Sequence, residues 1–301
     1  MESSTVHRET LRRNAMQTSD SRAIVDSPAP PWCRAALNYV AGDSVGGVAT
    51  RAVTVTVADG RQARLPGWES AGFELVEHAS QVQNWDDDDE IERVHYAEIA
   101  ALAQALSGCD HALVAGHIRR NPEEAARHAD LGPIAFVHSD FAASYGELIR
   151  GLYRDPKPES RRALERAGIT AEAVVNARRL LILQFWRNTG PQTMDLPIAF
   201  CDARSVPATD LRTLPVSDYA GGGFDFDTLG VVAPEDPARH QWYGFPGLGR
   251  DEVVAFRTYD SARLDRGEPF WTPHSAFADP TVAPGRPSRR SIELRATCLF
   301  R

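Results

Sequence analysis

The chain has 301 residues, of which 43% are hydrophobic and 25% are charged, as is usual for a globular protein. Its formal net charge is −8. The sequence contains no basic stripe interleaved with aromatic residues, which argues against a nucleic-acid partner. It also contains no signal-peptide core and no run of about 18 apolar residues, which predicts a cytoplasmic protein without a membrane partner. Four widely spaced cysteines, without a CxxC pair, indicate free thiols: Cys33, Cys109, Cys201 and Cys298.

The first 28 residues are polar and run into a proline-rich stretch, which predicts a flexible N-terminal tail. We expect residues 29–301 to form a single domain. Within it, residues 35–40 and 51–58 have strand patterns. Because Asp59-Gly60 follows the second run and another short run begins at Gln62, the pattern predicts a β-hairpin at that turn.

The middle of the chain mixes helical and strand patterns. Apolar residues at helical spacing predict one helix that stops at Gly108 and a second, polar helix with Pro122 in its first turn. The expected elements are helices at 91–107, 121–130, 141–153 and 158–180, the last interrupted near 168–170, and strands at 111–117 and 134–137.

After residue 180 the chain is dominated by short β-rich runs separated by Gly, Pro and Asp clusters. The expected strands cover residues 181–186, 197–201, 241–245, 252–258, 270–272 and 292–300. Many short strands with turns between them favour a sandwich or barrel, with the helical insertions packed outside it.

One triplet, His138-Ser139-Asp140, has the pattern of a metal-binding strand. Two imidazoles and one carboxylate on one face form the ligand set of non-haem iron oxygenases. Residues two apart in a strand share a face, and this triplet closes the apolar run 134–137. The other such triplet, His128-Ala129-Asp130, follows a segment that looks helical and exposed, and is therefore the weaker choice. As the alternative, Asp140 caps a helix that begins near Phe141.

The second histidine of such a site must come from later in the chain. His274 lies between apolar groups and is our choice for this ligand, although a buried core histidine is an equally good interpretation of the segment. His240 lies in a polar loop and is interpreted as a solvated side chain.

A cation suited to a carboxylate lies near the C-terminus. Arg289 and Ser291 share a face of the last strand, so we take Arg289 as the anchor of a carboxylate ligand with Ser291 assisting it. Arg295 lies on the same face and is the reserve candidate. A basic, exposed strand edge is the alternative for each of them.

These residues fall within ordered blocks that resemble the bacterial and fungal hydroxylase/desaturase family typified by CmcJ and NvfI. The resemblance runs from about residue 35 to the C-terminus. Its landmarks are Leu37-Asn38-Tyr39, Gly72-Phe73-Glu74-Leu75, Val137-His138-Ser139-Asp140, Trp186-Arg187-Asn188, the block 196–205, Trp242-Tyr243, the block 251–261, Pro273-His274-Ser275-Ala276-Phe277 and the block 289–295.

The resemblance implies a mostly β fold with α insertions, built on a double-stranded β-helix (jelly-roll, cupin-like) core flanked by helices. It also implies Fe(II) held by His138, Asp140 and His274, with 2-oxoglutarate and O2 as cosubstrates. The expected activity is hydroxylation, desaturation or cyclisation of a small-molecule secondary metabolite. Arg290 departs from the acidic residue that the family often has between its Arg and Ser. Arg187 is a further candidate for the cofactor pocket, with a structural role as its alternative.

Two other classes of protein remain open at this point. One is a non-catalytic β-barrel that binds a ligand or partner, and the other is a zinc hydrolase with the same three ligands. The pair Arg289 and Ser291 favours the oxygenase, because it suits a dicarboxylate. No feature of the sequence predicts an oligomeric state.

Overall fold

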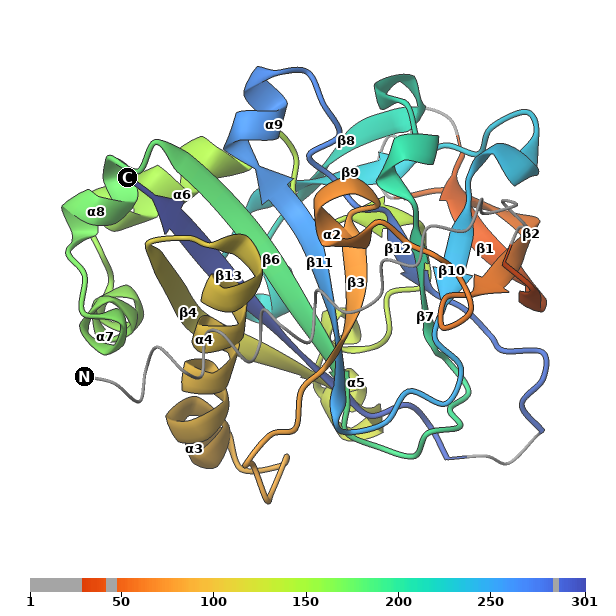
Figure 1. The fold of residues 1–301 in the computed structure, drawn as a ribbon, viewed down its shortest axis with the longest axis horizontal. Coiled ribbons are helices and arrows are strands. Elements are labelled where there is room, and N and C mark those ends of the chain that lie inside the picture. The colour runs from red at the N-terminus through yellow and green to blue at the C-terminus, as the bar shows by residue number, and fades with distance from the viewer. Residues whose placement is uncertain (1–28, 42–47, 284–286) are drawn as a thin grey trace, which may run out of the picture.

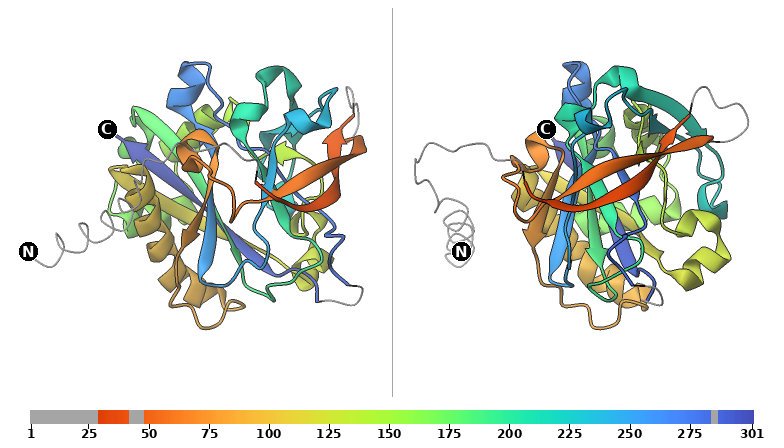
Figure 2. Two further views of the ribbon diagram at one scale, coloured as in Figure 1. Left: turned by 45° about the vertical axis from the view of Figure 1, so that its right-hand side comes forward. Right: turned by 90° about the vertical axis from the view of Figure 1, so that its right-hand side faces the viewer.

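The computed structural model describes residues 29–41, 48–283 and 287–301, so the predicted tail, residues 1–28, lies outside the described part. Two β-sheets face each other and form the centre of the fold (Figures 1 and 2). The large sheet has the strand order β1 (Pro31–Val40), β2 (Thr50–Asp59), β10 (Trp242–Gly244), β7 (Ile198–Cys201), β12 (His274–Ala276), β5 (His138–Ser139), β9 (Phe226–Val231) and β8 (Leu211–Val216). The small sheet has the order β3 (Phe73–Glu77), β11 (Glu252–Asp260), β6 (Arg179–Asn188), β13 (Ser291–Phe300) and β4 (His111–Arg120).

Most neighbouring strands in both sheets are far apart in the sequence. Among the named strands the pairs are antiparallel except for β10 with β2. Two facing antiparallel sheets with such long connections form a jelly roll, or double-stranded β-helix. The predicted fold class is therefore confirmed.

The helices surround this core. They are α2 (Gly67–Ser70), α3 (Asp88–Glu90), a π-helical turn (Ile91–His95), α4 (Tyr96–Ser107), α5 (Pro122–Arg127), α6 (Tyr145–Arg154), α7 (Pro158–Ala167), α8 (Ala171–Val175) and α9 (Ser261–Asp265). Short 3-10 turns cover Ala129–Leu131, Ala203–Ser205, Ala208–Asp210, Tyr219–Gly221 and Pro237–Arg239. No helix in the described ranges is long and apolar enough to cross a membrane.

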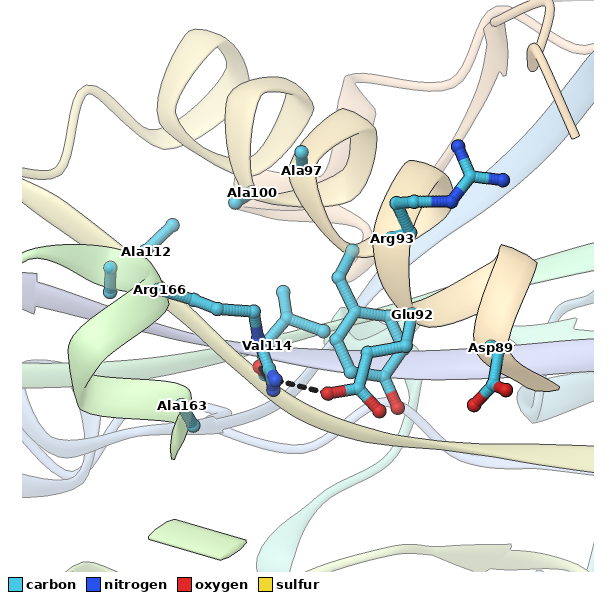
Figure 3. Close-up of a pocket in the computed structure, with 11 residues that line it drawn as sticks. Asp89, Glu92, Arg93, Ala97, Ala100, Ala112, Val114, Ala163 and Arg166 are labelled. Carbon is cyan, nitrogen blue, oxygen red and sulfur yellow. Dashed lines mark hydrogen bonds and ion pairs between the residues drawn. The ribbon is translucent and has the colours of Figure 1, made fainter. Parts of the chain in front are cut away.

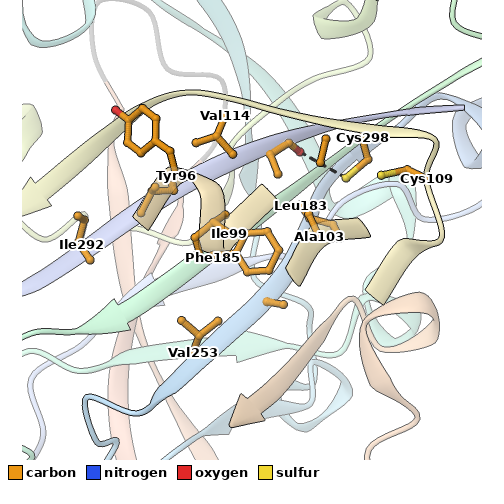
Figure 4. Packing of buried hydrophobic residues seen from close by; sticks show 14 of the residues in the cluster. Tyr96, Ile99, Ala103, Cys109, Val114, Leu183, Phe185, Val253, Ile292 and Cys298 are labelled. Carbon is orange, nitrogen blue, oxygen red and sulfur yellow. Dashed lines mark hydrogen bonds between the residues drawn. The ribbon is translucent and has the colours of Figure 1, made fainter. Parts of the chain in front are cut away.

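Alternation along β6 separates the two faces of the small sheet. Leu183 and Phe185 pack against α4, which covers the outer face (Figures 1 and 4). Trp186 points the other way and packs in the apolar cluster that contains Phe200 of the large sheet. Because strand side chains alternate between faces, every second residue of β6 and β13 points into the space between the sheets.

One hairpin prediction and two strand predictions are wrong. The run 51–58 does form β2, but β2 pairs antiparallel with β1, and the turn after Asp59 leads towards α2 instead of a hairpin partner. β1 is the antiparallel partner of β2, and its alternating apolar residues, such as the fully buried Leu37 and Tyr39, point into the core. In the segment 134–137, Phe136 makes a single bridge to Asn38, and the strand is formed by the next two residues as β5. Residues 270–272 are not a strand either, since β12 begins at His274.

Candidate metal centre

The pairing of two short strands brings the predicted histidines together. β5 lies between β12 and β9 in the large sheet, and His138 is directly opposite His274. Asp140 follows β5 immediately. It does not cap the next helix, because α6 begins at Tyr145 with Ser144 as its N-cap residue. All three side chains are buried, with exposed fractions of 4 to 6%.

The ligand atoms of these three residues lie close enough to share one metal ion. Oδ1 of Asp140 is 3.5 Å from Nε2 of His138 and 3.3 Å from Nε2 of His274. The three donor atoms all lie within 4.8 Å of one another. Bonds of about 2.1 Å at right angles place two ligand atoms about 3 Å apart, so the observed spacing suits a metal after small movements.

Backbone carbonyl groups orient both imidazoles in the same way. Nδ1 of His138 donates to the carbonyl oxygen of Phe136 at 2.8 Å, and Nδ1 of His274 donates to that of Thr272 at 3.0 Å. A carbonyl oxygen only accepts, so each Nδ1 carries a proton, and Nε2, the nitrogen that faces Asp140, is the atom of each ring placed to bind a metal. This is the tautomer that metal binding requires.

The electrostatics of the cluster also favour metal ligation. Burial alone would raise the pKa of Asp140, but the charge of Arg295 and the contacts of the carboxylate with His138 and His274 hold this pKa well below its usual range. Burial and the neighbouring His274 lower the pKa of His138. The site therefore offers a carboxylate and neutral imidazole, which are the forms that bind a metal ion.

A small cavity of about 20 Å³ adjoins the three residues. Its lining comes from both sheets and comprises Arg120, Ile134, His138, Asp140, Gln184, Ile198, His274, Ala276, Arg289 and Glu293. The large sheet contributes the histidines, and the small sheet contributes the glutamine, the glutamate and Arg120. About one water molecule fits such a volume, so a larger ligand enters only when side chains move.

Arg289 is a buried residue whose guanidinium bonds to neutral groups. Its Nε donates to Oγ of Ser291 at 3.0 Å, and its Nη1 donates to the carbonyl of Leu196 at 3.2 Å. Its guanidinium stacks on the ring of Trp186. Burial and the nearby Arg120 lower its pKa to about 9. Among the described residues no carboxylate forms an ion pair with it, which leaves the guanidinium able to bind an anion from outside the chain.

The other two arginines of the prediction occupy different surroundings. Arg295 binds the Asp140 carboxylate, with Nη2 2.8 Å from Oδ2. Arg187 points away from the cavity: its Nη1 donates to the carbonyls of His78 and Arg250, and its guanidinium stacks on Trp85. Arg187 is therefore not brought to the metal cluster, because odd-numbered residues of β6 face the outer side of the sheet.

Three polar side chains at the cavity were missed in the sequence. Glu293 lies two residues from Ser291, so strand alternation could have found it. Gln184 interrupts the apolar run of β6, is 1% exposed, and its Oε1 has no hydrogen-bond partner in the described part of the chain. Arg120 could not have been found from spacing, because only the pairing of β4 with β13 places it opposite Ser291.

The histidines set aside in the sequence lie elsewhere. His240 was interpreted as solvated, and this was wrong: it is 2% exposed, with Nε2 2.9 Å from Oδ2 of Asp210 and Nδ1 3.2 Å from the hydroxyl of Tyr39. The weaker triplet behaves as expected. The side chains of His128 and Asp130 are 40% and 39% exposed, and Nδ1 of His128 lies 3.5 Å from Oδ2 of Asp130. The same Oδ2 also accepts from the backbone N–H of Ala220 at 2.9 Å.

A larger cavity, of about 480 Å³, lies away from this cluster between α4, β4 and α7 (Figure 3). Alanine side chains form much of its wall, and an ion pair between Arg166 and Glu92 crosses it. It contains none of the metal-site residues, so its size alone does not make it the reaction site.

Two imidazoles and a carboxylate inside a jelly roll are the ligand arrangement of non-haem iron(II) oxygenases. Comparisons with known proteins agree with this class. Residues 30–299 match the family model described as an oxidoreductase/YMDC permease-like domain. The chain is 30% identical to the hydroxylase/desaturase efuI of Hormonema carpetanum over 239 residues, 75% of this chain and 76% of that protein. It is 28% identical to the hydroxylase/desaturase CTB9 of Cercospora beticola over 229 residues, 70% of this chain and 66% of that protein.

The fold has a counterpart among solved structures. A variant of the iron and alpha-ketoglutarate-dependent endoperoxidase NvfI superposes with a TM-score of 0.72 at 22% identity, covering 92% of this chain and 99% of that one. The chain belongs to the hydroxylase/desaturase family of Fe(II)/2-oxoglutarate-dependent oxygenases. The prediction of such an enzyme, in place of a non-catalytic barrel, is thereby confirmed.

Proposed function

We propose that His138, Asp140 and His274 bind Fe(II) and that Arg289, assisted by Ser291, binds the far carboxylate of 2-oxoglutarate. The observation that carries this assignment is the buried guanidinium of Arg289, which lines the same cavity as the three ligands and has no carboxylate partner among the described residues. A dicarboxylate with one end at the metal and the other at Arg289 would neutralise it.

The proposed domain spans residues 29–301 and acts on a small-molecule secondary metabolite by hydroxylation, desaturation or cyclisation. The names of its relatives, hydroxylase/desaturase and alpha-ketoglutarate-dependent dioxygenase, support this range of reactions. We also propose a cytoplasmic enzyme without nucleic-acid or membrane partners, which the acidic composition supports.

The chain's own residues position the reactants. Fe(II) with 2-oxoglutarate and O2, when bound, supplies the oxidising chemistry that releases succinate and carbon dioxide and breaks a substrate C–H bond. His138 and His274 are oriented by their Nδ1 hydrogen bonds, and Arg289 would hold the far carboxylate of the cosubstrate. Phe200 and Phe256 pack beside His274 and exclude water from that side.

The proposal is tested by anaerobic titration of the metal-free protein with Fe(II) and 2-oxoglutarate, following the visible charge-transfer band of the chelate. We expect the band in the wild type and its loss in His138→Ala and His274→Ala. Arg289→Gln should weaken 2-oxoglutarate binding about 10- to 100-fold, because a charged hydrogen bond contributes about 1.5–3 kcal/mol.

Arg290→Gln is the matched control, because the Arg290 side chain points outward, is 38% exposed and pairs with Glu123. It should leave the affinity for 2-oxoglutarate within about 2-fold of the wild type. A wild-type protein that binds no iron would contradict the proposed function. Equal losses in the two arginine variants would contradict the role given to Arg289.

A further inference from the structure

We propose that Arg295 is a positioning residue for the metal-ligand carboxylate and not a second anchor for 2-oxoglutarate. The inference rests on the proposed function, because it takes Asp140 as an iron ligand. It assigns Arg295, which the sequence left as a reserve cosubstrate ligand, to a different task at the same centre.

The two oxygens of the Asp140 carboxylate have separate partners. Nη2 and Nε of Arg295 both donate to Oδ2, at 2.8 and 3.2 Å. Oδ1 is the oxygen that faces Nε2 of His138 and Nε2 of His274. The guanidinium therefore fixes the rotation of the carboxylate and leaves one oxygen for the metal.

Arg295 is itself held by a chain of alternating charges. Oε1 of Glu293 lies 3.6 Å from Nη2 of Arg295 and 2.7 Å from Nη2 of Arg120. Arg120 also donates through Nη1 to the carbonyls of Asp130 and Gly132, at 2.6 and 2.7 Å. The guanidinium of Arg295 stacks on Phe141 at 5.4 Å. Each charge in this chain has an opposite neighbour, so Arg295 is fixed from both sides.

Arg289 and Arg295 therefore differ in their charged partners. The guanidinium of Arg289 forms no ion pair with a carboxylate among the described residues, whereas that of Arg295 pairs with two, Asp140 and Glu293. A cosubstrate carboxylate at Arg295 would have to displace Asp140 from it and add a third negative charge there. The residue free to take up an incoming carboxylate is Arg289, and the residue already engaged is Arg295.

Replacing a residue that hydrogen-bonds to a metal ligand usually weakens metal binding by about 10- to 100-fold. The test is calorimetric titration of the full-length, metal-free protein with Co(II) in the absence of 2-oxoglutarate, with the visible bands of bound Co(II) as a report on ligand geometry. We expect Arg295→Met to weaken Co(II) binding about 10- to 100-fold and to alter these bands. Arg295→Lys should restore part of the affinity, since an ammonium can reach one oxygen of Asp140.

Arg289→Met serves as the comparison variant from the same strand face. It should bind Co(II) within about 2-fold of the wild type and lose affinity for 2-oxoglutarate, which Arg295→Lys should retain. Far-UV circular dichroism and thermal melting identify a variant that fails to fold. If Arg295→Met does not fold, Arg295→Lys tests the positioning role by itself. We then expect it to lose more affinity for Co(II) than for 2-oxoglutarate.

Two results would overturn the inference. Co(II) affinity and spectrum unchanged in folded Arg295→Met would remove the positioning role while leaving the proposed function intact. A loss of 2-oxoglutarate affinity in Arg295→Lys as large as in Arg289→Met would make Arg295 an anchor. A wild-type protein that does not bind Co(II) at all would overturn the proposed function and this inference together.

Discussion

His138 and His274 are direct cross-strand partners, with ring centroids 4.4 Å apart. The register of two very short strands therefore sets the distance between the two imidazoles. A slip of one residue would turn one of the rings to the opposite face of the sheet. The backbone N–H of Thr272, which donates to Oγ of Ser139 at 3.1 Å, holds the register next to the histidines.

Gly72 supports this arrangement from the neighbouring sheet. Its carbonyl accepts from Oγ1 of Thr272 at 3.0 Å, and the carbonyl of Thr272 orients His274. Gly72 has φ of +98°, and an added Cβ would lie 2.3 Å from Oγ1 of Thr272. We expect Gly72→Ala to destabilise the protein by about 2 kcal/mol or more and to weaken metal binding, because Thr272 must shift. Urea denaturation and metal titration measure the two effects.

Gly116→Ala is the control for this substitution. Gly116 is exposed in β4 and has open space where a Cβ would be added. Stability should change by less than about 1 kcal/mol and metal affinity should not change. If both alanine variants behaved alike, the contact between Gly72 and Thr272 would have no influence on the metal site.

How much of this site could be predicted depends on how local its determinants are. The triplet His138-Ser139-Asp140 and the alternation of Arg289 with Ser291 are visible in the sequence, because strand periodicity is a local property. Arg187 was a candidate for the pocket or for a structural role, and the alternation of β6 sends its side chain to the face away from the cavity. The strands β8 and β9 were missed, since Gly, Pro and Asp residues interrupt their apolar pattern.

Other features depend on contacts between distant segments. The burial of His240 requires Tyr39 and Asp210, which lie 201 and 30 residues away in the chain. The two oxygens of Asp140 have different partners because β13 faces the end of β5. Neither relationship leaves a periodic signal, so a sequence pattern alone cannot distinguish a solvated histidine from a fully bonded one.

The buried network around His240 should be important for stability. Its two ring nitrogens are bonded to Asp210 and Tyr39, and the Tyr39 hydroxyl also accepts from Nε1 of Trp242 at 2.8 Å. We expect His240→Ala to lower the free energy of unfolding by about 2–4 kcal/mol, from the cavity and the lost hydrogen bonds. Chemical denaturation measures this change.

The exposed His128 provides the comparison. His128→Ala removes a side chain that is 40% exposed and should cost less than about 1 kcal/mol. A comparable loss of stability in the two variants would mean that the buried network adds nothing beyond a surface contact.

His95 should make stability depend on pH. Burial lowers its pKa to about 4, opposed by its hydrogen bond to Glu98 and reinforced by the charge of Arg187. The unfolded chain, with a His pKa of about 6.5, binds the proton more tightly than the folded chain does. Stability from this group is therefore full above about pH 6.5 and is lost as the pH falls towards 4.

Urea denaturation at pH 7, 6 and 5 tests this dependence. His95→Gln, which keeps a hydrogen-bond donor for Glu98, should show a smaller loss of stability between pH 7 and 5 than the wild type. Identical pH dependence in both proteins would show that other groups titrate in this range instead.

Arg187 should matter for stability and not for cosubstrate binding. Its guanidinium donates to the carbonyls of His78 and Arg250 on the face of the small sheet away from the cavity. We expect Arg187→Met to destabilise the fold by about 1–3 kcal/mol, because it removes the hydrogen bonds of a buried guanidinium to two part-buried carbonyl groups. The dissociation constant of 2-oxoglutarate should stay within about 2-fold. A selective loss of cosubstrate affinity, with unchanged stability, would return Arg187 to the pocket.

The division of the site between the two sheets has a mechanical consequence. The histidines belong to the large sheet, while Ser291 begins β13 of the small sheet and Arg289 lies two residues before it. A dicarboxylate bound at both ends would form a reversible link between the two sheets of the jelly roll. Binding of the cosubstrate would then make the two-sheet core more rigid. Conversion of 2-oxoglutarate to the shorter succinate would weaken this link, so that each turnover would end with weaker binding of the product.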